Sequence, residues 1–466
     1  MSLPSVLIEQ LKKLTSFSKE AFEKAHASGE QVTSIRVNPV KASMVNSEWS
    51  IGDSIPHSPF TIQHKIPWTQ WGFYLSQRPS FTFDPLFHAG CYYVQEASSM
   101  FLEQALKQTV DLSKPVKVLD LCAAPGGKST HIHSLISQKS LLISNDVIRS
   151  RVNILKDNII KWGCENVLVT NNDPKDFAQL QNYFDVIVVD APCSGSGLFR
   201  RDPNAINEWS ENNVQLCSQR QQRILADIWP ALKKDGILIY STCSYSKEED
   251  EDIVNWLMNE FAIDYSPLTL PVRQAGIHPD WGIVDTGIGY RFWPDKVKGE
   301  GFFIACFQKK EGGTEMAFKA KSKPEQVTRK EMELIEKWVR KDGRSFIKHI
   351  NTVYAWPEQH VNDFSFLLEK FNVVYSGTLI GELMRDKLVP DHALAMSNRV
   401  ADSINSMELN YQQSIQFLQR KDINIAPANK GWQLVTYQGH PLGWINALPN
   451  RINNYYPKEL RILKDI

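Results

Sequence analysis

The sequence contains no long hydrophobic run that would suggest a membrane protein. None of its segments approaches the roughly 18 uncharged apolar residues that a membrane-spanning helix needs. The N-terminal stretch MSLPSVLIEQLKKL lacks the order of basic, apolar and small residues that is typical of a signal peptide. We therefore expect a cytoplasmic protein that does not associate with a membrane.

Cysteine is scarce and unpaired along the chain. The seven cysteines are scattered, and no two of them form a CxxC pair. That spacing excludes the usual local zinc site, so no metal is expected. A disulfide framework is equally unexpected in a long cytoplasmic chain. Each cysteine is therefore either a small core residue or a chemical group.

The chain also lacks an excess of charge of either sign. Its 52 Lys and Arg balance its 52 Asp and Glu, whereas a nucleic-acid binder usually carries a basic face. A balanced total can still hide a local basic patch. There is no internal repeat and no low-complexity tract. A length of 466 residues fits roughly two to four domains.

Short apolar runs alternate with helix-like segments between residues 117 and 307. The runs are VKVLDL, SLLISND, NVLVTNND, FDVIVVD, GILIYST and GFFIACFQKK. Near-continuous apolar strands separated by helices predict an α/β fold, with a parallel sheet covered on both faces. We expect one helix, QRQQRILADIWPALKKDG, to end at Gly236. Its apolar residues recur at helical spacing: Ile224, Leu225, Ile228 and Leu232.

The segment DLCAAPGGKST, residues 120–130, joins the first predicted strand to its helix. In open α/β sheets ligands bind at the carboxyl ends of the strands. Two glycines allow a ligand to approach the backbone, and the helix N-terminus behind them attracts anions. A phosphate-binding P-loop would need glycine where Cys122 stands, and the GxGxxG fingerprint is absent. A glycine-rich turn without any ligand is the alternative.

Two aspartates follow the next strands. Asp146 ends the second strand and could bind ribose hydroxyls, and Asp173 after the third strand could accept a hydrogen bond from an adenine amino group. Either aspartate alone could be an ordinary turn or cap residue. Together with the glycine loop they favour an adenosine cofactor that lacks two bridging phosphates. S-adenosylmethionine fits this description, because its carboxylate can lie at the helix N-terminus.

Two cysteines are predicted at neighbouring strand ends. DAPCSGSG, residues 190–197, places Asp190 and Cys193 at the sheet edge where YSTCSYS, residues 240–246, places Cys243. Burial as a small apolar residue is the alternative for either cysteine. A thiolate is the attacking form, so a reactive cysteine needs electropositive surroundings. Three side chains could supply them, although the two arginines could equally form a solvated loop pair: Lys128, Arg200 and Arg201.

An acid-rich stretch, KEEDEDI, follows the second cysteine motif. We interpret it as the start of a helix, EEDEDIVNWLMNEF, because the helix dipole favours acidic residues in the first turn by about 0.3–1 kcal/mol each.

The segments DLCAAPGGKS, DAPCSGSG and YSTCS resemble the signature blocks of the RNA 5-methylcytosine methyltransferases of the Nol1/Nop2/Sun family. The resemblance covers residues 30–310 and includes RVNP and VQEASS upstream. It implies a Rossmann-like class I S-adenosylmethionine methyltransferase sheet at 114–310, after an N-terminal RNA-recognition region at 1–113. A charged linker at 311–330 and a separate region at 331–466 would follow. The end of that region alternates strand-like and turn residues and resembles a β-rich, PUA-like RNA-binding module.

The resemblance also implies roles for individual residues. Cys243 would be the nucleophile that adds to carbon 6 of cytosine, and Cys193 would release the adduct. Asp190 would hold the edge of the base, and Lys128 would support cofactor or base. The DNA cytosine methyltransferases use the cysteine after proline instead, so spacing alone does not assign the nucleophile. The implied S-adenosylmethionine-binding residues are Cys122, Ala123, Ala124, Pro125, Gly126, Gly127, Lys128, Asp146, Asp173 and Asp190.

The expected substrate is ribosomal RNA of the small subunit, methylated by a monomer. The same reaction on tRNA or large-subunit RNA is an alternative, and so is a non-catalytic RNA-binding factor for ribosome assembly. The target cytosine must be unstacked or flipped out, with aromatic and phosphate contacts around it. C-terminal candidates for these contacts, each with ordinary packing as its alternative, are Trp432, Trp444, Arg451, Tyr455 and Tyr456.

Overall fold

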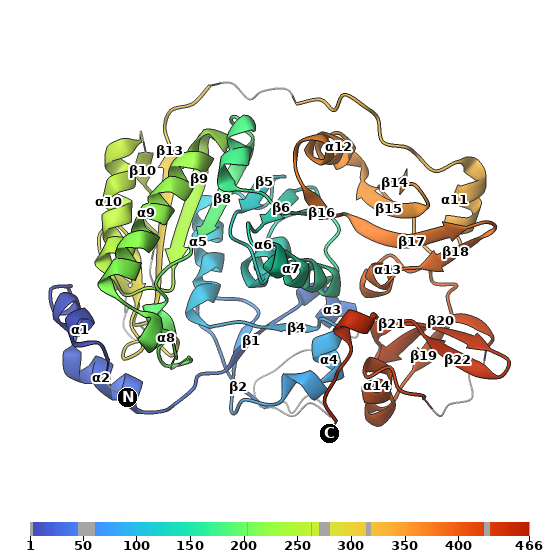
Figure 1. Ribbon diagram of the computed structural model, residues 1–466, viewed down its shortest axis with the longest axis horizontal. Helices are drawn as coiled ribbons and strands as arrows, with labels where there is room; N and C mark the ends of the chain where they lie inside the picture. Colours follow the sequence, from blue (N-terminus) through green and yellow to red (C-terminus); the bar gives the residue numbers. More distant parts are fainter. Residues whose placement is uncertain are drawn as a thin grey trace.

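The computed structural model describes residues 3–44, 61–202, 204–261, 263–269, 280–313, 318–423 and 429–465. Figure 1 shows a large sheet with its helices in one half of the molecule and a group of β-strands, coloured orange and red, in the other half. Across these residues, no helix combines the length and the hydropathy needed to span a bilayer.

A ten-stranded sheet forms the centre of the molecule, and it confirms the predicted Rossmann-like α/β fold. The strand order is β11-β12-β13-β9-β8-β5-β6-β7-β16, and β10 pairs with β13. Neighbours from β9 to β7 run parallel. These five strands are β5 (Lys117–Asp120), β6 (Leu141–Asn145), β7 (Val167–Thr170), β8 (Phe184–Asp190) and β9 (Leu232–Thr242). Antiparallel strands complete one side: β10 (Ile263–Tyr265), β11 (Val284–Asp285), β12 (Tyr290–Phe292) and β13 (Phe302–Lys309).

Helices cover both faces of this sheet, as the apolar strands predict. Alternate residues of a strand point to opposite faces, so neighbouring Val118 and Leu119 belong to different hydrophobic cores. Val118 shares its core with apolar residues of α6 (Gly127–Leu135) and α7 (Arg149–Trp162). Leu119 shares its core with residues of α9 (Glu211–Ile228) and α10 (Glu251–Glu260). The short α8 (Asn204–Glu208) precedes α9.

The predicted end of helix α9 at Gly236 is wrong. The α-helix ends at Ile228, and a 3-10 turn, Trp229–Ala231, follows it. Pro230 stands in that turn and has no amide hydrogen with which to continue the helical ladder. Leu232, which matches the helical spacing in the sequence, is instead the first residue of strand β9 and is buried.

The N-terminal region adds a smaller antiparallel sheet of order β2-β3-β1-β4. Arg36 of β1 is buried and reaches α6, where it donates hydrogen bonds to Thr130 Oγ1 at 2.6 Å and to the carbonyl of Gly127 at 3.2 Å. The N-terminal sheet is thereby attached to the helix that follows the glycine loop. Its elements are α1 (Ser5–Leu11), α2 (Lys19–Ala27), β1 (Ser34–Val37), α3 (Pro39–Met44), β2 (Ile62–Lys65), β3 (Gly72–Leu75), α4 (Pro85–His88), β4 (Tyr92–Val94) and α5 (Leu102–Thr109).

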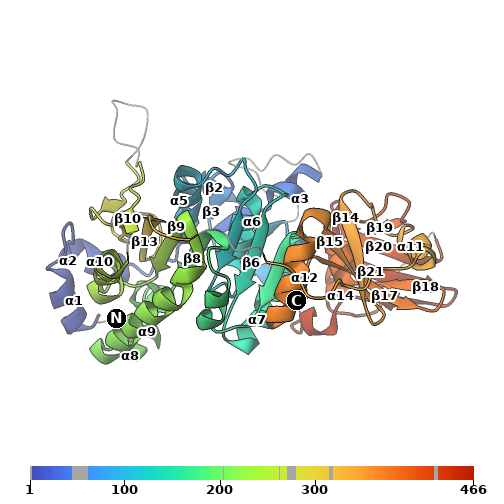
Figure 2. The same cartoon turned by 90° about the horizontal axis from the view of Figure 1, so that it is seen from above.

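The C-terminal region contains two four-stranded sheets and confirms the predicted β-rich module. One sheet has the order β14-β15-β17-β18, and the last has the order β19-β20-β21-β22. Figure 2 shows this region extending from one end of the central sheet. The strands are β14 (Arg344–His349), β15 (Thr352–Pro357), β17 (Thr378–Met384), β18 (Lys387–Pro390), β19 (Ser406–Glu408), β20 (Gly431–Tyr437), β21 (His440–Leu448) and β22 (Arg451–Asn454). The helices are α11 (Arg329–Ile335), α12 (Val361–Lys370), α13 (His392–Met396) and α14 (Tyr411–Leu418).

One strand of the C-terminal region joins the central sheet. Strand β16 (Val373–Ser376) pairs antiparallel with β7, which the sequence does not predict. Nearby, the buried carboxylate of Glu165 accepts a hydrogen bond from Arg399 Nε at 2.7 Å and forms an ion pair with Arg344. The C-terminal region is therefore joined to the central sheet by the strand pairing of β16 with β7 and by the ion pairs of Glu165 with Arg344 and Arg399.

Two of the five C-terminal residues proposed to contact RNA lie in the protein core. Trp444 is 1% exposed and donates a hydrogen bond to the carbonyl of Asp391, and Tyr456 is 2% exposed. The prediction is wrong for this pair, because both side chains are buried, and the Tyr456 hydroxyl lies 3.4 Å from Nδ1 of His88 in the N-terminal region. Trp432 and Tyr455 form a ring contact with centroids 4.3 Å apart, and Tyr455 is exposed. Arg451 is also exposed.

Candidate active site

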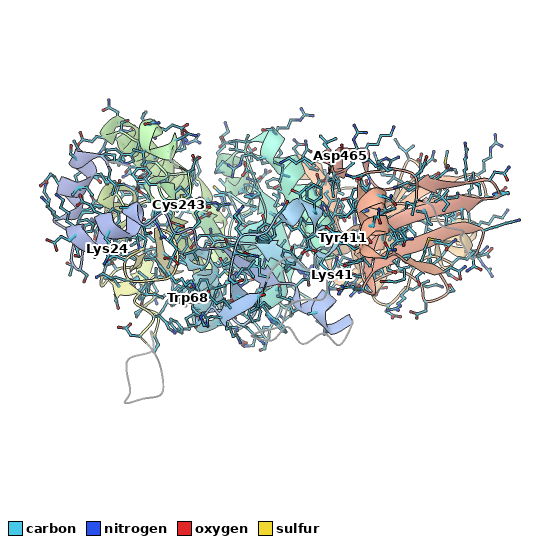
Figure 3. All side chains as sticks on the ribbon, turned by 90° about the horizontal axis from the view of Figure 1, so that it is seen from below. Lys24, Lys41, Trp68, Cys243, Tyr411 and Asp465 are labelled. Carbon is cyan, nitrogen blue, oxygen red and sulfur yellow. The ribbon has the colours of Figure 1, made fainter. Side chains whose placement is uncertain are left out.

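The carboxyl ends of the parallel strands converge on one cavity. Its volume is about 490 Å³. Figure 3 places Cys243 within the part of the molecule formed by the central sheet, whereas Tyr411 lies in the C-terminal region. The structure thus brings together residues from four separate sequence motifs. The predicted site residues that line the cavity are Cys122, Ala124, Asp146, Asp190, Cys193 and Cys243.

The glycine loop forms one wall of this cavity. The amide of Gly126 donates to the carbonyl of Ala123 at 2.8 Å, which closes a tight turn. Gly126 has a φ of 111°, a conformation that glycine adopts without steric cost. Helix α6 begins at Gly127 directly behind this turn. The remaining predicted loop residues do not line the cavity themselves: Ala123, Pro125, Gly126, Gly127 and Lys128.

The two cysteine sulfurs are in direct contact. Cys193 Sγ lies 3.2 Å from Cys243 Sγ, which is too long for the roughly 2 Å bond of a disulfide, so both are free thiols. The hydrogen bond with Cys243, together with burial, raises the pKa of the Cys193 thiol well above its ordinary value. Cys193 therefore keeps its proton and can donate it in a hydrogen bond to the sulfur of Cys243.

Lys128 forms an ion pair with Asp190, which lines the cavity beside the two cysteines. Its Nζ lies 2.7 Å from Asp190 Oδ2, and Ser241 Oγ donates to the other oxygen of Asp190 at 2.8 Å. Burial opposes the charge on Lys128, but the attraction of Asp190, Asp120 and Cys243 outweighs it and raises the pKa of the ammonium.

The arginines of the GLFRRD segment do not face the cysteines. Arg200 donates to the carbonyls of Gly299 at 3.0 Å and Glu30 at 2.7 Å. Arg201 lines a separate small cavity next to Glu300. The predicted contribution of these arginines to the field around the thiols is therefore wrong.

The residues around the cavity fit a cofactor such as S-adenosylmethionine. Asp146 accepts hydrogen bonds from the amides of Ala124 at 3.2 Å and Ile148 at 2.9 Å, which fixes it against the glycine loop. Asp120 accepts from Ser129 through Oδ2, while its buried Oδ1 has no hydrogen-bond partner among the described residues. Asp120 itself is fully buried and does not line the cavity. Burial raises the pKa of Asp120 to about 7.

Asp173 lies outside the cavity lining, although its neighbour Pro174 is part of it. Its carboxylate caps the 3-10 helix Pro174–Gln179 by accepting from the amide of Lys175, and Arg223 lies 3.8 Å away. The cap alternative is therefore realised, while contact with adenine stays a prediction. Asp120 was not singled out in the sequence, although it is the first residue of the glycine motif.

Comparison with known proteins agrees with this architecture. The family model of the 16S rRNA methyltransferase RsmB/F matches residues 107–308. The N-terminal domain of 16S rRNA methyltransferase RsmF matches residues 3–97, and the methyltransferase RsmF PUA domain matches residues 404–462. A methyltransferase homolog from Pyrococcus horikoshii superposes with a TM-score of 0.51 and 27% identity, over 66% of this chain and 100% of that chain.

Two curated relatives are similar over nearly the whole chain. Ribosomal RNA small subunit methyltransferase F of Shewanella sediminis is 30% identical over 92% of this chain and 90% of its own. The protein of the same name from Pectobacterium atrosepticum is 29% identical over 98% of this chain and 96% of its own. The chain therefore belongs to the family of ribosomal RNA small subunit methyltransferase F.

Proposed function

We propose that this protein transfers a methyl group from S-adenosylmethionine to carbon 5 of a cytosine in 16S ribosomal RNA. The observation that carries the proposal is the contact between Cys193 and Cys243, 3.2 Å apart, at the sheet edge that also bears the glycine loop. The names of the relatives support 16S rRNA as the substrate. A ribosomal substrate also agrees with the cytoplasmic location expected from the sequence.

Cys122 and Ala124 of the glycine loop, together with Asp146, would hold S-adenosylmethionine in the cavity. When bound, its sulfonium supplies an electrophilic methyl group. Carbon 5 of cytosine is a weak nucleophile and needs activation before it can accept that methyl group. The cofactor-binding wall and Cys243 line the same cavity, so donor and activated base would be held close together.

Cys243 would activate the base by covalent catalysis. Its thiolate adds to carbon 6, and the electron pair of the 5,6 double bond then makes carbon 5 nucleophilic. Asp190 would receive the polar edge of the base. Asp190 Oδ2 pairs with Lys128, and Asp190 Oδ1 accepts a hydrogen bond from Ser241. Each oxygen keeps a second lone pair that can accept a hydrogen bond from the base.

Cys193 would act when the adduct breaks down. After methyl transfer, a water molecule takes the proton from carbon 5, the electron pair of that C–H bond re-forms the 5,6 double bond, and Cys243 leaves as a thiolate. A protonated Cys193 that donates to Cys243 Sγ stabilises this leaving group. The raised pKa of Cys193 agrees with that role, because the thiol keeps its proton until it is needed.

Two cysteine variants test this division of roles. Cys243→Ser should abolish methyl transfer, whereas Cys193→Ser should accumulate a protein–RNA adduct that survives denaturing gel electrophoresis. Cys217→Ser is a matched control, because Cys217 lies in helix α9 and does not line the cavity. An adduct in the Cys243 variant but not in the Cys193 variant would reverse the roles.

Bisulfite sequencing of cellular RNA with and without the protein identifies the substrate. Loss of one methylcytosine from 16S rRNA is the expected result. Loss of a methylcytosine from tRNA or large-subunit RNA would show that this RNA is the substrate instead, with the same reaction. No loss in any RNA would favour a non-catalytic assembly factor.

A further inference from the structure

The acidic stretch after Cys243 contains one carboxylate with an unusual position. Glu249 is fully buried at 0% exposure, in the 3-10 turn just before helix α10. Its Oε1 accepts a hydrogen bond from the backbone amide of Ser194 at 2.7 Å, and its Oε2 accepts from the hydroxyl of Ser194 at 2.6 Å. Ser194 directly follows Cys193, so Glu249 holds the first cysteine loop at two points.

The same carboxylate holds the second cysteine loop. Glu249 Oε2 also accepts from the hydroxyl of Ser244 at 2.6 Å, and Ser244 directly follows Cys243. The amide of Ser246 donates to Ser244 Oγ at 3.0 Å, which fixes the direction of that hydroxyl. One carboxylate therefore bonds to the residue after each reactive sulfur.

Glu249 is itself anchored to the scaffold. Tyr240 of strand β9 donates its hydroxyl to the carbonyl of Glu249 at 2.6 Å. Gln221 of helix α9 contacts Glu249 Oε1 at 3.4 Å and donates to the carbonyl of Pro192 at 3.0 Å. The groups that contact the carboxylate can all donate, which matches an ionised carboxylate that can only accept.

The neighbouring acidic residues make different contacts. Asp250 accepts from Thr242 at 2.5 Å, and Glu251 pairs with Arg291 at 2.6 Å. Glu248 is half-buried, and its backbone carbonyl accepts a hydrogen bond from Ser218 Oγ at 2.9 Å. Among the described acidic residues of this stretch, Glu249 alone contacts both cysteine loops. A general preference for acids at a helix start does not explain that selectivity.

We propose that Glu249 is a positioning residue that holds the Cys193 and Cys243 sulfurs in contact. The inference rests on the proposed function for its effect on adduct release, but the position of the two thiols can be measured without RNA. With the loops released from Glu249, Cys193 no longer donates to the departing sulfur of Cys243, and the covalent adduct persists.

The test compares Glu249→Gln with the matched control Glu248→Gln. The glutamine keeps the size of the side chain, but one of the two acceptor oxygens is replaced by an NH2 group, which cannot accept from the donors on that side. We expect the rate of methyl transfer to fall by about tenfold to a hundredfold, the loss typical of a hydrogen bond to a charged group. Adduct should accumulate, while KM for RNA and the affinity for S-adenosylmethionine stay near wild type. Glu248→Gln should behave as wild type in each assay.

A second readout measures thiol contact directly in the full-length protein without RNA. Dibromobimane becomes fluorescent when it bridges two nearby thiols, and Cys193→Ser gives the background signal. Glu249→Gln should lose most of this signal, and Glu248→Gln should retain it. If Glu249→Gln does not fold, Ser244→Ala removes only one donor and should lower the signal to a smaller extent.

The outcomes separate the inference from the proposed function. If folded Glu249→Gln gives the same dibromobimane fluorescence as the wild type, the positioning role is overturned. If Glu249→Gln is unfolded, the same fluorescence in Ser244→Ala as in the wild type overturns it. Normal methyl transfer without adduct in Glu249→Gln would also overturn it. In a further outcome the wild-type protein does not methylate RNA, while Glu249→Gln still loses the dibromobimane signal. That result would refute the proposed function and leave the positioning role of Glu249 intact.

Discussion

Gly197 is one of the points at which the two cysteine loops touch, and replacing it with alanine is a direct steric test of their arrangement. Its amide donates to the carbonyl of Cys243 at 2.8 Å. A Cβ at this position would lie 2.6 Å from the carbonyl oxygens of both Cys243 and Gly301. Ordinary contact begins at 3.4 Å, so each separation must grow by 3.4 − 2.6, about 0.8 Å.

Both neighbours are backbone atoms, which cannot rotate away as a flexible side chain would. Overpacking of this kind costs about 1–3 kcal/mol. A shift of about 1 Å in a reacting group can reduce a rate by roughly a hundredfold. Gly197→Ala should therefore loosen the two loops and slow methyl transfer by up to roughly that factor.

Hydrogen exchange of residues 191–197 and 241–246 measures the local loss of stability, and single-turnover kinetics measure the rate. Gly313→Ala is the matched control, because among the described residues its added Cβ would meet only Asn182 Nδ2, at 3.4 Å. Unchanged exchange and an unchanged rate in Gly197→Ala would refute the close packing of the loops.

Two further predictions concern the attachment and packing of the C-terminal region. Glu165→Ala leaves the guanidiniums of Arg344 and Arg399 without their shared carboxylate and should lower the free energy of unfolding by about 3–5 kcal/mol. The loss should appear as faster proteolysis of residues 331–466, and proteolysis at the wild-type rate would contradict this prediction. Burial lowers the pKa of His392 to about 3 and of His440 to about 4 from an ordinary 6.5. Below pH 6.5 the unfolded imidazoles take up protons while the folded ones do not, so these two histidines contribute a stability that is constant above that pH and falls as pH drops towards 4. The buried carboxyl of Asp120, whose pKa is raised to about 7, acts in the opposite direction, so the urea midpoint between pH 7.5 and pH 5 is compared between the wild type and the double variant His392→Asn with His440→Asn. An equal pH dependence in the two proteins would contradict this second prediction.

The central sheet could be predicted because its signal is local. Each parallel strand is a short apolar run, and each is followed by turn residues and a helical pattern. The same locality explains why Asp190, Cys193 and Cys243 could be assigned to one edge: they directly follow strands whose parallel order fixes where they end. The helical spacing of Leu232 predicts a helix where the structure has the start of strand β9, because the turn that contains Pro230 ends the helix first.

Long-range pairing was not visible in the sequence. Strand β16 adds to β7 across roughly 200 residues, and nothing in VVYS marks it as a strand of the central sheet rather than of its neighbours. A truncation that removes residues 331–466 would therefore also expose the edge of β7. The burial of Trp444 and the contacts of Glu249 likewise depend on elements distant in sequence.

Identification of the residue that bonds to RNA tests the central claim most directly. Cys193→Ser is incubated with substrate RNA and S-adenosylmethionine, and the trapped complex is digested with nuclease and protease for mass spectrometry. We expect a cytidine-derived mass on the peptide that contains Cys243. A modification on any other residue, or methylated RNA produced by Cys243→Ser, would contradict it.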